Sequence, residues 1–353
     1  AYPNDEGLAA QVEALVAPSN SWHHVVDVFL EAADAVENGD VKKQLLFRTA
    51  RVLADEQKDM EGAERVYRVV LEYDPTDAQA HNAIEELHRN AGDHEGLVGL
   101  LLDRLESETD GSVRAGILRE VAGLYEEELG AEENAFVAYT QALAEDPDDP
   151  RAARAVERLA STPEQWVEAI ESLQDTIDNP DRPQAALALC LVVAQWYTKR
   201  LARPDLALPY LNRALAIDPA HEPALEAMTN IFRDAQSWTE LVQILMHRAD
   251  SANPAKARDL RAEAASVLHH NIGDTASASQ IFESVFADDP SHPAALEALE
   301  EIYLNECALE KLGELFTHKA KEQRGAERAA TLCDLAMLHE EGLQDIEGAL
   351  THY

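Results

Sequence analysis

The stretch Ala63-Glu-Arg-Val-Tyr67-Arg-Val-Val70-Leu71-Glu-Tyr-Asp74-Pro75 decides the fold, because its pattern occurs four times in the chain. The pattern is a small residue, an aromatic residue or Leu four positions later, an apolar pair after three and four more positions, and a closing Asp-Pro step. The later Asp-Pro steps begin at Asp146, Asp218 and Asp289, so all four steps are almost evenly spaced. This spacing predicts a tandem repeat.

Each copy has the spacing of one face of an α-helix, because residues three and four positions apart lie on the same side of a helix. The alanine at its start lets a neighbouring helix approach closely. The Asp-Pro step ends the helix, since proline disfavours helical geometry in the residue before it. A second proline often follows, where it suits the first turn of the next helix; these prolines are Pro150, Pro223 and Pro293.

Other residues recur at the same interval. One series is Ala50, Ala122, Ala194, Ala265 and Ala336, and another is Trp22, His94, Trp166, Trp238 and Leu309. Residues at a fixed phase usually bury the interface that neighbouring repeats share. We therefore predict that these series pack in the core. The repeat-packing residues of the four main copies are Ala50, Ala63, Tyr67, Ala122, Ala135, Tyr139, Ala194, Ala207, Leu211, Ala265, Ala278 and Phe282.

The chain has 353 residues, which is more than one ordinary core of ~250–300 residues accommodates. A repeat array avoids that limit, because each unit contacts only its neighbours. We expect one continuous solenoid of about twenty helices, four in each full repeat, with no β-strand. Both ends lack a polar capping helix, so we also expect a segment of a longer chain. The predicted repeats are 40–111, 112–183, 184–255 and 256–326, with partial repeats at 1–39 and 327–353.

The net charge is −38. Such a charge argues against nucleic-acid binding through a basic surface and against anchoring on anionic membranes. It fits a solvated acidic surface that keeps the array soluble, a cationic partner, or a salt-rich habitat. No apolar run reaches the length of ~18 residues that indicates a membrane span, so we predict no membrane insertion.

Three cysteines form neither a disulfide framework nor a metal-binding spacing. Cys190 and Cys333 occupy apolar helical faces, where we expect buried thiols, whereas Cys307 falls in a predicted turn. An odd number of cysteines favours a reducing compartment. We predict a cytoplasmic protein, with the periplasm or an envelope-associated complex as the alternative.

The hairpin pattern resembles the tetratricopeptide repeat, in which a small residue of the first helix pairs with an Ala, Tyr or Phe, Ala-Leu and Pro series in the second. The first match is Ala50 with Ala63, Tyr67, Val70, Leu71 and Pro75. The usual repeat has ~34 residues, about half of the interval between Asp-Pro steps, so each period holds one good hairpin and one degenerate hairpin. The resemblance implies an all-α, right-handed α-solenoid (superhelix) of stacked antiparallel helix hairpins. It names no ligand, because this architecture serves many partners.

Family members that bind a C-terminal carboxylate line the groove of the solenoid with paired basic residues and Asn. The residues expected to face inward here are apolar or acidic, so we predict no such clamp. They include Arg48, Thr49, Val52, Glu120, Val121, Leu124, Val192, Val193, Trp196, Glu263, Ala264 and Val267.

The helix predicted over 186–200 is apolar on almost every side, and three basic residues cluster at its end. A helix of this kind is either buried or offers a groove to a partner. If the array has a binding site, we predict that it consists of Trp196, Tyr197, Lys199, Arg200 and Arg203.

His23-His24 and His269-His270 suggest a metal at first sight. Adjacent residues of a helix point about 100° apart, so we predict no metal site. The chain has no nucleophile motif and no glycine-rich phosphate loop, and in so acidic a chain a chance carboxylate pair carries no information. We therefore predict neither catalysis nor a cofactor.

Taken together, these features predict a non-catalytic scaffold that binds partner proteins or peptides along a helical groove. The alternative is a structural subunit that assembles into a filament or a large multi-protein machine. A helical toroid with enzyme activity is the third and weakest interpretation.

Overall fold

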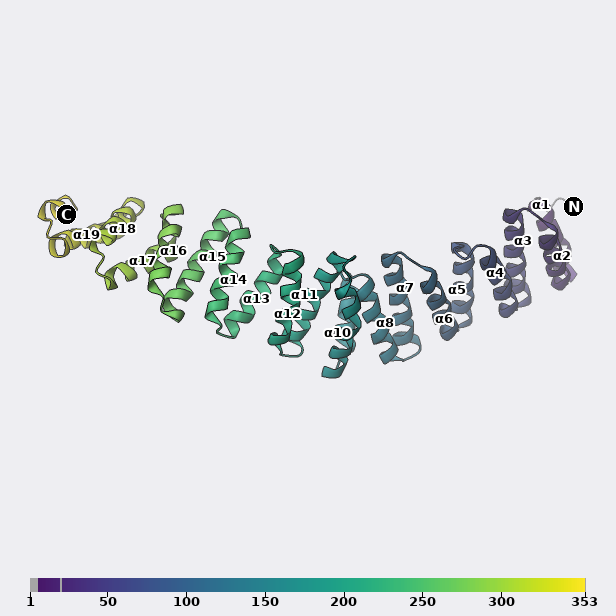
Figure 1. The fold of residues 1–353 in the computed structure, drawn as a ribbon. Coiled ribbons are helices and arrows are strands. Elements are labelled where there is room, and N and C mark those ends of the chain that lie inside the picture. Colours follow the sequence, from purple (N-terminus) through teal and green to yellow (C-terminus); the bar gives the residue numbers. More distant parts are fainter. Residues whose placement is uncertain (1–5, 20, 353) are drawn as a thin grey trace. The chain divides into compact units, whose positions relative to one another are not determined.

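The computed structural model describes residues 6–19 and 21–352 (Figure 1). These residues form twenty α-helices, together with short 3-10 and π turns, and contain no β-strand. The prediction of an all-α chain of about twenty helices is therefore confirmed. The chain divides into an N-terminal unit, residues 1–165, and a C-terminal unit, residues 166–353.

The N-terminal unit contains nine of the described helices. They are α1 (Glu6–Val16), α2 (Trp22–Ala35), α3 (Gly39–Val52), α4 (Met60–Tyr73), α5 (Ala78–Ala91), α6 (His94–Ser107), α7 (Gly111–Gly123), α8 (Glu132–Glu145) and α9 (Pro150–Leu159). Consecutive helices pack against each other as hairpins, as α7 and α8 do.

The C-terminal unit begins within the first turn of α10. Its helices are α10 (Pro163–Asp178), α11 (Pro183–Lys199), α12 (Pro204–Ile217), α13 (Glu222–Asp234), α14 (Trp238–Ser251), α15 (Pro254–Val267), α16 (Thr275–Asp288), α17 (Pro293–Asn305), α18 (Leu309–Glu322), α19 (Gly325–Met337) and α20 (Ile346–His352). The same pairing of consecutive helices holds here, with α11 against α12 and α14 against α15.

Aspartates set many of the helix ends. Asp74 lies at φ −136° and ψ 86° and ends α4 directly before Pro75. Asp59 begins the same helix, since its side chain accepts a hydrogen bond of 2.9 Å from the backbone N–H of Gly62. A side chain that satisfies one of the free N–H groups at a helix start stabilises it by about 1 kcal/mol.

The residues that recur at a fixed phase lie inside the hairpins. Each alanine of the first-helix and second-helix positions is buried, from Ala50 and Ala63 in the first repeat to Ala265 and Ala278 in the fourth. Leu211 and Phe282 are also buried, whereas Tyr139 is half-buried. In the recurring series that begins at Trp22, only Trp166 is buried. The other four members are half-buried: Trp22, His94, Trp238 and Leu309.

The first helix of most good hairpins ends differently from the sequence prediction. The apolar stripe of Leu46, Phe47, Ala50 and Leu53 predicts a single helix over 41–56, but α3 stops at Val52 and continues as a π turn, Leu53–Gln57. Equivalent π turns follow α7, α15 and α19, but none follows α11. The π turn shifts the backbone bonds from i→i−4 to i→i−5, and apolar spacing alone does not report that change.

The cysteines follow the prediction in two of three cases. Cys190 is buried in α11, and Cys307 is exposed in a turn with φ of +54°. The expectation that Cys333 is buried was wrong. On α19 the residues that face the core are Thr331, Leu335 and Ala336, and Cys333 lies outside that stripe and is exposed.

Candidate functional site: a groove between two first helices

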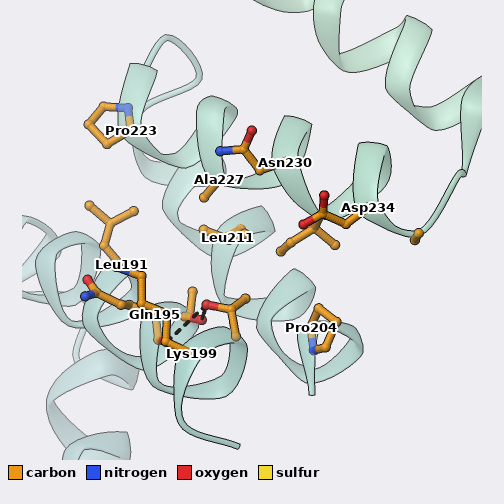
Figure 2. A pocket seen from close by; sticks show the side chains of 13 residues that line it. Leu191, Gln195, Lys199, Pro204, Leu211, Pro223, Ala227, Asn230 and Asp234 are labelled. Carbon is orange, nitrogen blue, oxygen red and sulfur yellow. Dashed lines mark hydrogen bonds between the residues drawn. The ribbon is translucent and has the colours of Figure 1, made fainter. Parts of the chain in front are cut away.

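A groove lies between α11 and α13, the first helices of two consecutive hairpins in the C-terminal unit (Figure 2). Its volume is about 730 Å³, within the range of ~300–1,000 Å³ that is common for ligand pockets. The second helix of the first hairpin, α12, contributes Leu211 to the floor, and Pro204 and Pro223 line it from the starts of α12 and α13.

The packing of α11 explains which of its side chains reach the groove. Trp196 is only 1% exposed, and its ring lies 5.2 Å from the ring of Trp166 on α10. Cys190 and Val193 are fully buried. With these faces of α11 covered, the remaining face carries Leu191, Gln195, Thr198 and Lys199, and all four line the groove.

The floor of the groove is apolar and its edges are polar. Leu191 and Ala194 of α11, Leu211 of α12, and Ala227 and Ile231 of α13 form the floor. Figure 2 shows Gln195 and Lys199 on one side of the groove and Asn230 and Asp234 on the other. An apolar floor with a few polar groups at its edge is the usual composition of a binding pocket.

The polar groups at the edge are available to a ligand. Lys199 and Asp234 are exposed, and neither forms an ion pair within the part of the chain that the structure describes. Asn230 is held in place, because its Oδ1 accepts a hydrogen bond of 2.9 Å from Arg233, whose guanidinium also donates to Glu263 of α15 at 2.6 Å. The NH₂ group of Asn230 keeps its two donors for a ligand.

The structure separates the residues predicted to form a binding site. Lys199 lines the groove, but Trp196 is buried, which contradicts its expected role in contacting a partner. Tyr197 is half-buried beside Tyr210, with ring centroids 5.8 Å apart. Both aromatic side chains of α11 thus pack against other aromatic rings, and the partly exposed Tyr197 does not line the groove.

The other two basic residues near the end of α11 have partners of their own. The guanidinium of Arg200 lies 5.8 Å from the ring centroid of Trp166. Arg203 binds Asp205 through two hydrogen bonds of 2.7 and 2.8 Å, and these bonds lower the pKa of the Asp205 carboxyl. Of the predicted basic cluster, the structure therefore places only Lys199 in the groove.

The residues expected to line the inner face are mostly in the core. The buried ones are Thr49, Val52, Val121, Val193, Trp196, Ala264 and Val267. The α11 residues that line the groove lie on a different side of the helix; they include Leu191, Gln195, Thr198 and Lys199. A shift of one or two positions along a helix turns a side chain by about 100–200°, so a small error in phase exchanges the groove face for the core.

Cys190 lies one residue from the groove but offers no reactive thiolate. Burial raises the pKa of the Cys190 thiol to about 11. The thiolate is the nucleophilic form of cysteine, so this residue acts as a small apolar side chain that supports the floor.

In the second repeat, two charged residues bridge the place that is equivalent to the groove. The counterparts of Thr198 and Asn230, one full period earlier in the sequence, are Glu126 and Arg158. Arg158 bridges from α9 to Glu126, which follows α7, with one hydrogen bond of 2.8 Å and a second, shorter one. In the third repeat both positions are uncharged, and Thr198 donates to Ala194 of its own helix at 2.9 Å. The groove therefore lies where this cross-helix bridge is missing.

The second repeat also differs in the floor. The counterpart of Leu191 is Arg119, whose Nε lies 3.0 Å from Oδ2 of Asp149, so a charged pair replaces the apolar side chain. The signal for the groove was thus present in the sequence, as a change from charged to uncharged residues at equivalent phases. This signal lies at positions between the packing residues, whereas the recurring packing positions themselves are alike in both repeats.

A second hollow lies in the N-terminal unit along α3 and the start of α5. Its volume is about 520 Å³, and Gln44, Phe47, Arg48 and Gln79 are among the residues that line it. Both of its basic groups are already partnered, because Lys43 pairs with Asp77 and Arg48 lies 4.0 Å from Glu13. The groove between α11 and α13 is the better candidate.

None of the described helices is both long enough and apolar enough to cross a membrane. Neither a family model nor a curated protein matches the chain. Solved structures resemble it at low sequence identity. One is Naa15/Naa10 bound to HypK-THB, with 16% identity and a TM-score of 0.38 over 83% of this chain and 46% of that one. This chain thus spans less than half of that protein.

Two further structures with a similar arrangement of helices are shorter. YrrB, described as a TPR protein with an unusual peptide-binding site, has 18% identity and a TM-score of 0.30 over 56% of this chain and 96% of its own. The TPR2AB domain of yeast Sti1, in complex with pHSP90, has 14% identity and a TM-score of 0.25 over 73% of this chain and 96% of its own.

The hairpins themselves establish the fold. Paired antiparallel helices, buried alanines at the crossing points and closing Asp-Pro steps recur in both units at the interval of the sequence repeat. Each unit is therefore an all-α stack of antiparallel helix hairpins, with the pattern that resembles tetratricopeptide repeats.

Proposed function

We propose that the chain is a non-catalytic scaffold that binds an extended peptide segment of a partner protein in the groove between α11 and α13. The observation that carries this proposal is the open groove at a phase that an arginine–glutamate bridge closes in the second repeat. The apolar floor can receive alternate side chains of an extended peptide, and burial of apolar area supplies most of the affinity.

The edges of the groove define the chemistry of the peptide. The amides of Gln195 and Asn230 can each donate to and accept from a peptide backbone. Lys199 suits an acidic residue and Asp234 a basic one, so the two charges fix the direction of the peptide. The net charge of −38 favours a segment that is basic overall, because opposite charges accelerate encounter.

Closing the groove with the bridge of the second repeat tests the proposal. Thr198→Glu/Asn230→Arg places the counterparts of Glu126 and Arg158 in the third repeat without changing net charge. Peptides are first selected on the native chain from a displayed random library, and one fluorescent peptide is then titrated by anisotropy. We expect the double variant to bind that peptide at least about tenfold more weakly, which corresponds to ~1.4 kcal/mol.

A matched control carries the same charges elsewhere. Thr239→Glu/Gln243→Arg adds a Glu and an Arg four positions apart on the exposed face of α14, away from the groove. This variant should bind the peptide like the native chain, and both variants should retain the native helical circular dichroism. Equal affinity of native and closed chains for every selected peptide would refute the groove as the binding site.

Self-assembly is the second candidate function. On α20, Ile346 and Leu350 lie four positions apart and are 68% and 71% exposed, so they form an apolar stripe on one helical face. Sedimentation velocity across micromolar concentrations tests this proposal, with Ile346→Glu as the disrupting variant. A native chain that stays monomeric throughout would exclude assembly through this stripe.

A further inference from the structure

His269, His270 and Glu301 come together between two hairpins of the fourth repeat. The histidines lie in the π turn Leu268–Ile272 that follows α15, and Glu301 lies on α17. One donor atom from each of the three lies within 4.8 Å of the other two. We propose that these residues bind a divalent transition-metal ion of the Zn²⁺ type, which joins the two hairpins.

The sequence predicted no metal here, because adjacent side chains of an α-helix diverge by about 100°. The rings of His269 and His270 nevertheless lie with centroids 4.6 Å apart, and those of His23 and His24 on the regular helix α2 lie 4.0 Å apart. Adjacent histidines can therefore approach each other, and what sets the fourth repeat apart is the third donor, Glu301 of α17. π turns inside helices also occur frequently at functional sites.

A neighbouring hydroxyl orients the first ligand. Nδ1 of His269 lies 3.2 Å from Oγ1 of Thr275, and Nε2 lies 3.7 Å from Oε1 of Glu301. With Nδ1 donating to Thr275, the lone pair of Nε2 is directed at the carboxylate side. A metal-binding histidine usually donates its second ring N–H in this way, which fixes the tautomer and the ring orientation.

The distances require only small movements. Zinc bonds of ~2.0–2.1 Å in tetrahedral geometry place ligand atoms about 3.3 Å apart. The separation of 3.7 Å is close to that value, and His270 and Glu301 are exposed side chains that can rotate to shorten the wider gaps.

The donor set selects the class of ion. Two imidazoles and one carboxylate suit Zn²⁺, Co²⁺, Ni²⁺ or Cu²⁺, whereas Ca²⁺ and Mg²⁺ prefer oxygen ligands. Three protein ligands leave one position for water. His269, His270 and Glu301 occupy the repeat phase of Thr198, Lys199 and Asn230, one period later in the sequence. The same position is thus an ion pair in the second repeat, a groove in the third and a metal clamp in the fourth.

Titration of the tag-free chain with Co²⁺ tests the proposal, because four-coordinate Co²⁺ has strong visible absorption bands. We expect one saturable equivalent that Zn²⁺ displaces. His270→Gln or Glu301→Gln should abolish those bands, and both residues are exposed, so the fold should tolerate the changes. Thr275→Val should weaken Co²⁺ binding by about 10–100-fold, the usual effect of losing an orienting partner.

The chain offers two matched controls. His23 and His24 are also adjacent, with ring centroids 4.0 Å apart, but no described third donor completes a site with them. His23→Gln/His24→Gln should therefore leave the titration unchanged. Cys307→Ser/Cys333→Ser tests the two exposed thiols as competing ligands and should also change nothing. Bands that persist in His270→Gln/Glu301→Gln, or no saturable Co²⁺ binding in the micromolar range, would overturn the proposal.

Discussion

The second and third repeats share their core but differ between the first helices. In the second repeat Ala122 is buried, and Arg158 and Glu126 bridge the gap beside it. In the third repeat Ala194 is equally buried, yet Thr198 and Asn230 leave a groove. The packing positions fix the architecture, and the positions between them are free to change without disturbing it.

This difference indicates where a repeat array can accommodate a binding site. Each hairpin needs its alanines and apolar residues to bury the interface with its neighbours. The ends of the first helices carry no such requirement, so successive repeats place a bridge, a groove or a histidine cluster there. A functional residue in this chain is therefore found by departure from the repeat, not by agreement with it.

The largest expected effect concerns Trp196, which distinguishes the third repeat from the second. Trp196→Ala should lower the free energy of unfolding by ~3–5 kcal/mol, because it leaves a large cavity beside Trp166. Chemical denaturation followed by circular dichroism measures the change. The groove should also bind its selected peptide less tightly, since Gln195 and Lys199 depend on the position of α11.

The counterpart of Trp196 in the second repeat provides the control. Leu124 is half-buried, so Leu124→Ala should cost clearly less than Trp196→Ala and should leave peptide binding unchanged. Equal losses of stability in the two variants would show that the third repeat does not depend on its tryptophan pair.

The periodicity of the sequence predicted the hairpins well, because each buried alanine and each Asp-Pro step reports a local physical requirement. Asp74 ends a helix whatever surrounds it, and Ala63 is buried because only a small residue fits the crossing. Cys190 is buried because its place in the apolar spacing of α11 directs it into the core. Local requirements of this kind can be inferred from neighbouring residues along the chain.

The candidate site depended on partners that lie far away in sequence. Trp196 was predicted to contact a partner if the array has a binding site, but it is buried and packs against Trp166 of the preceding helix. Arg203 is the exception, because its partner Asp205 lies only two positions along the chain. Glu301, the third donor beside His269 and His270, lies on another hairpin and far along the sequence. Of the predicted cluster, Lys199 alone lies in the groove.

The bridge of the second repeat should have a smaller and pH-dependent effect. A double-mutant cycle with Glu126→Thr and Arg158→Asn should give a coupling energy of ~0.2–1 kcal/mol at pH 7, because the arginine is exposed to water. The hydrogen bond from Arg158 lowers the pKa of the Glu126 carboxyl below its ordinary value of 4.5. The coupling should therefore be fully present above pH 4.5 and disappear as the pH falls through the lowered pKa.

Urea denaturation of the four proteins at pH 7 and at an acidic pH measures this coupling. The same cycle built on Thr198→Glu and Asn230→Arg in the third repeat should show the same pH dependence, since it installs the same pair at the same phase. A coupling that stays constant as the carboxyl group is protonated would mean that the second repeat does not owe its closed state to this ion pair.

The smallest expected effect lies in the turn after the first helix of each good hairpin. Ala202 has φ of +51° in the third repeat, whereas its counterpart in the second repeat is Gly130, with φ of +62°. The left-handed region costs a residue with a Cβ ~1–2 kcal/mol, and glycine avoids that cost but loses ~0.5–1 kcal/mol of chain entropy. Ala202→Gly should therefore stabilise the chain by about 0.5 kcal/mol, measured by thermal denaturation.

The converse change Gly130→Ala has space for a Cβ, so it should destabilise the chain by a similar amount through the backbone alone. Opposite signs for the two variants would show that the third repeat retains a strained turn that the second repeat has relieved.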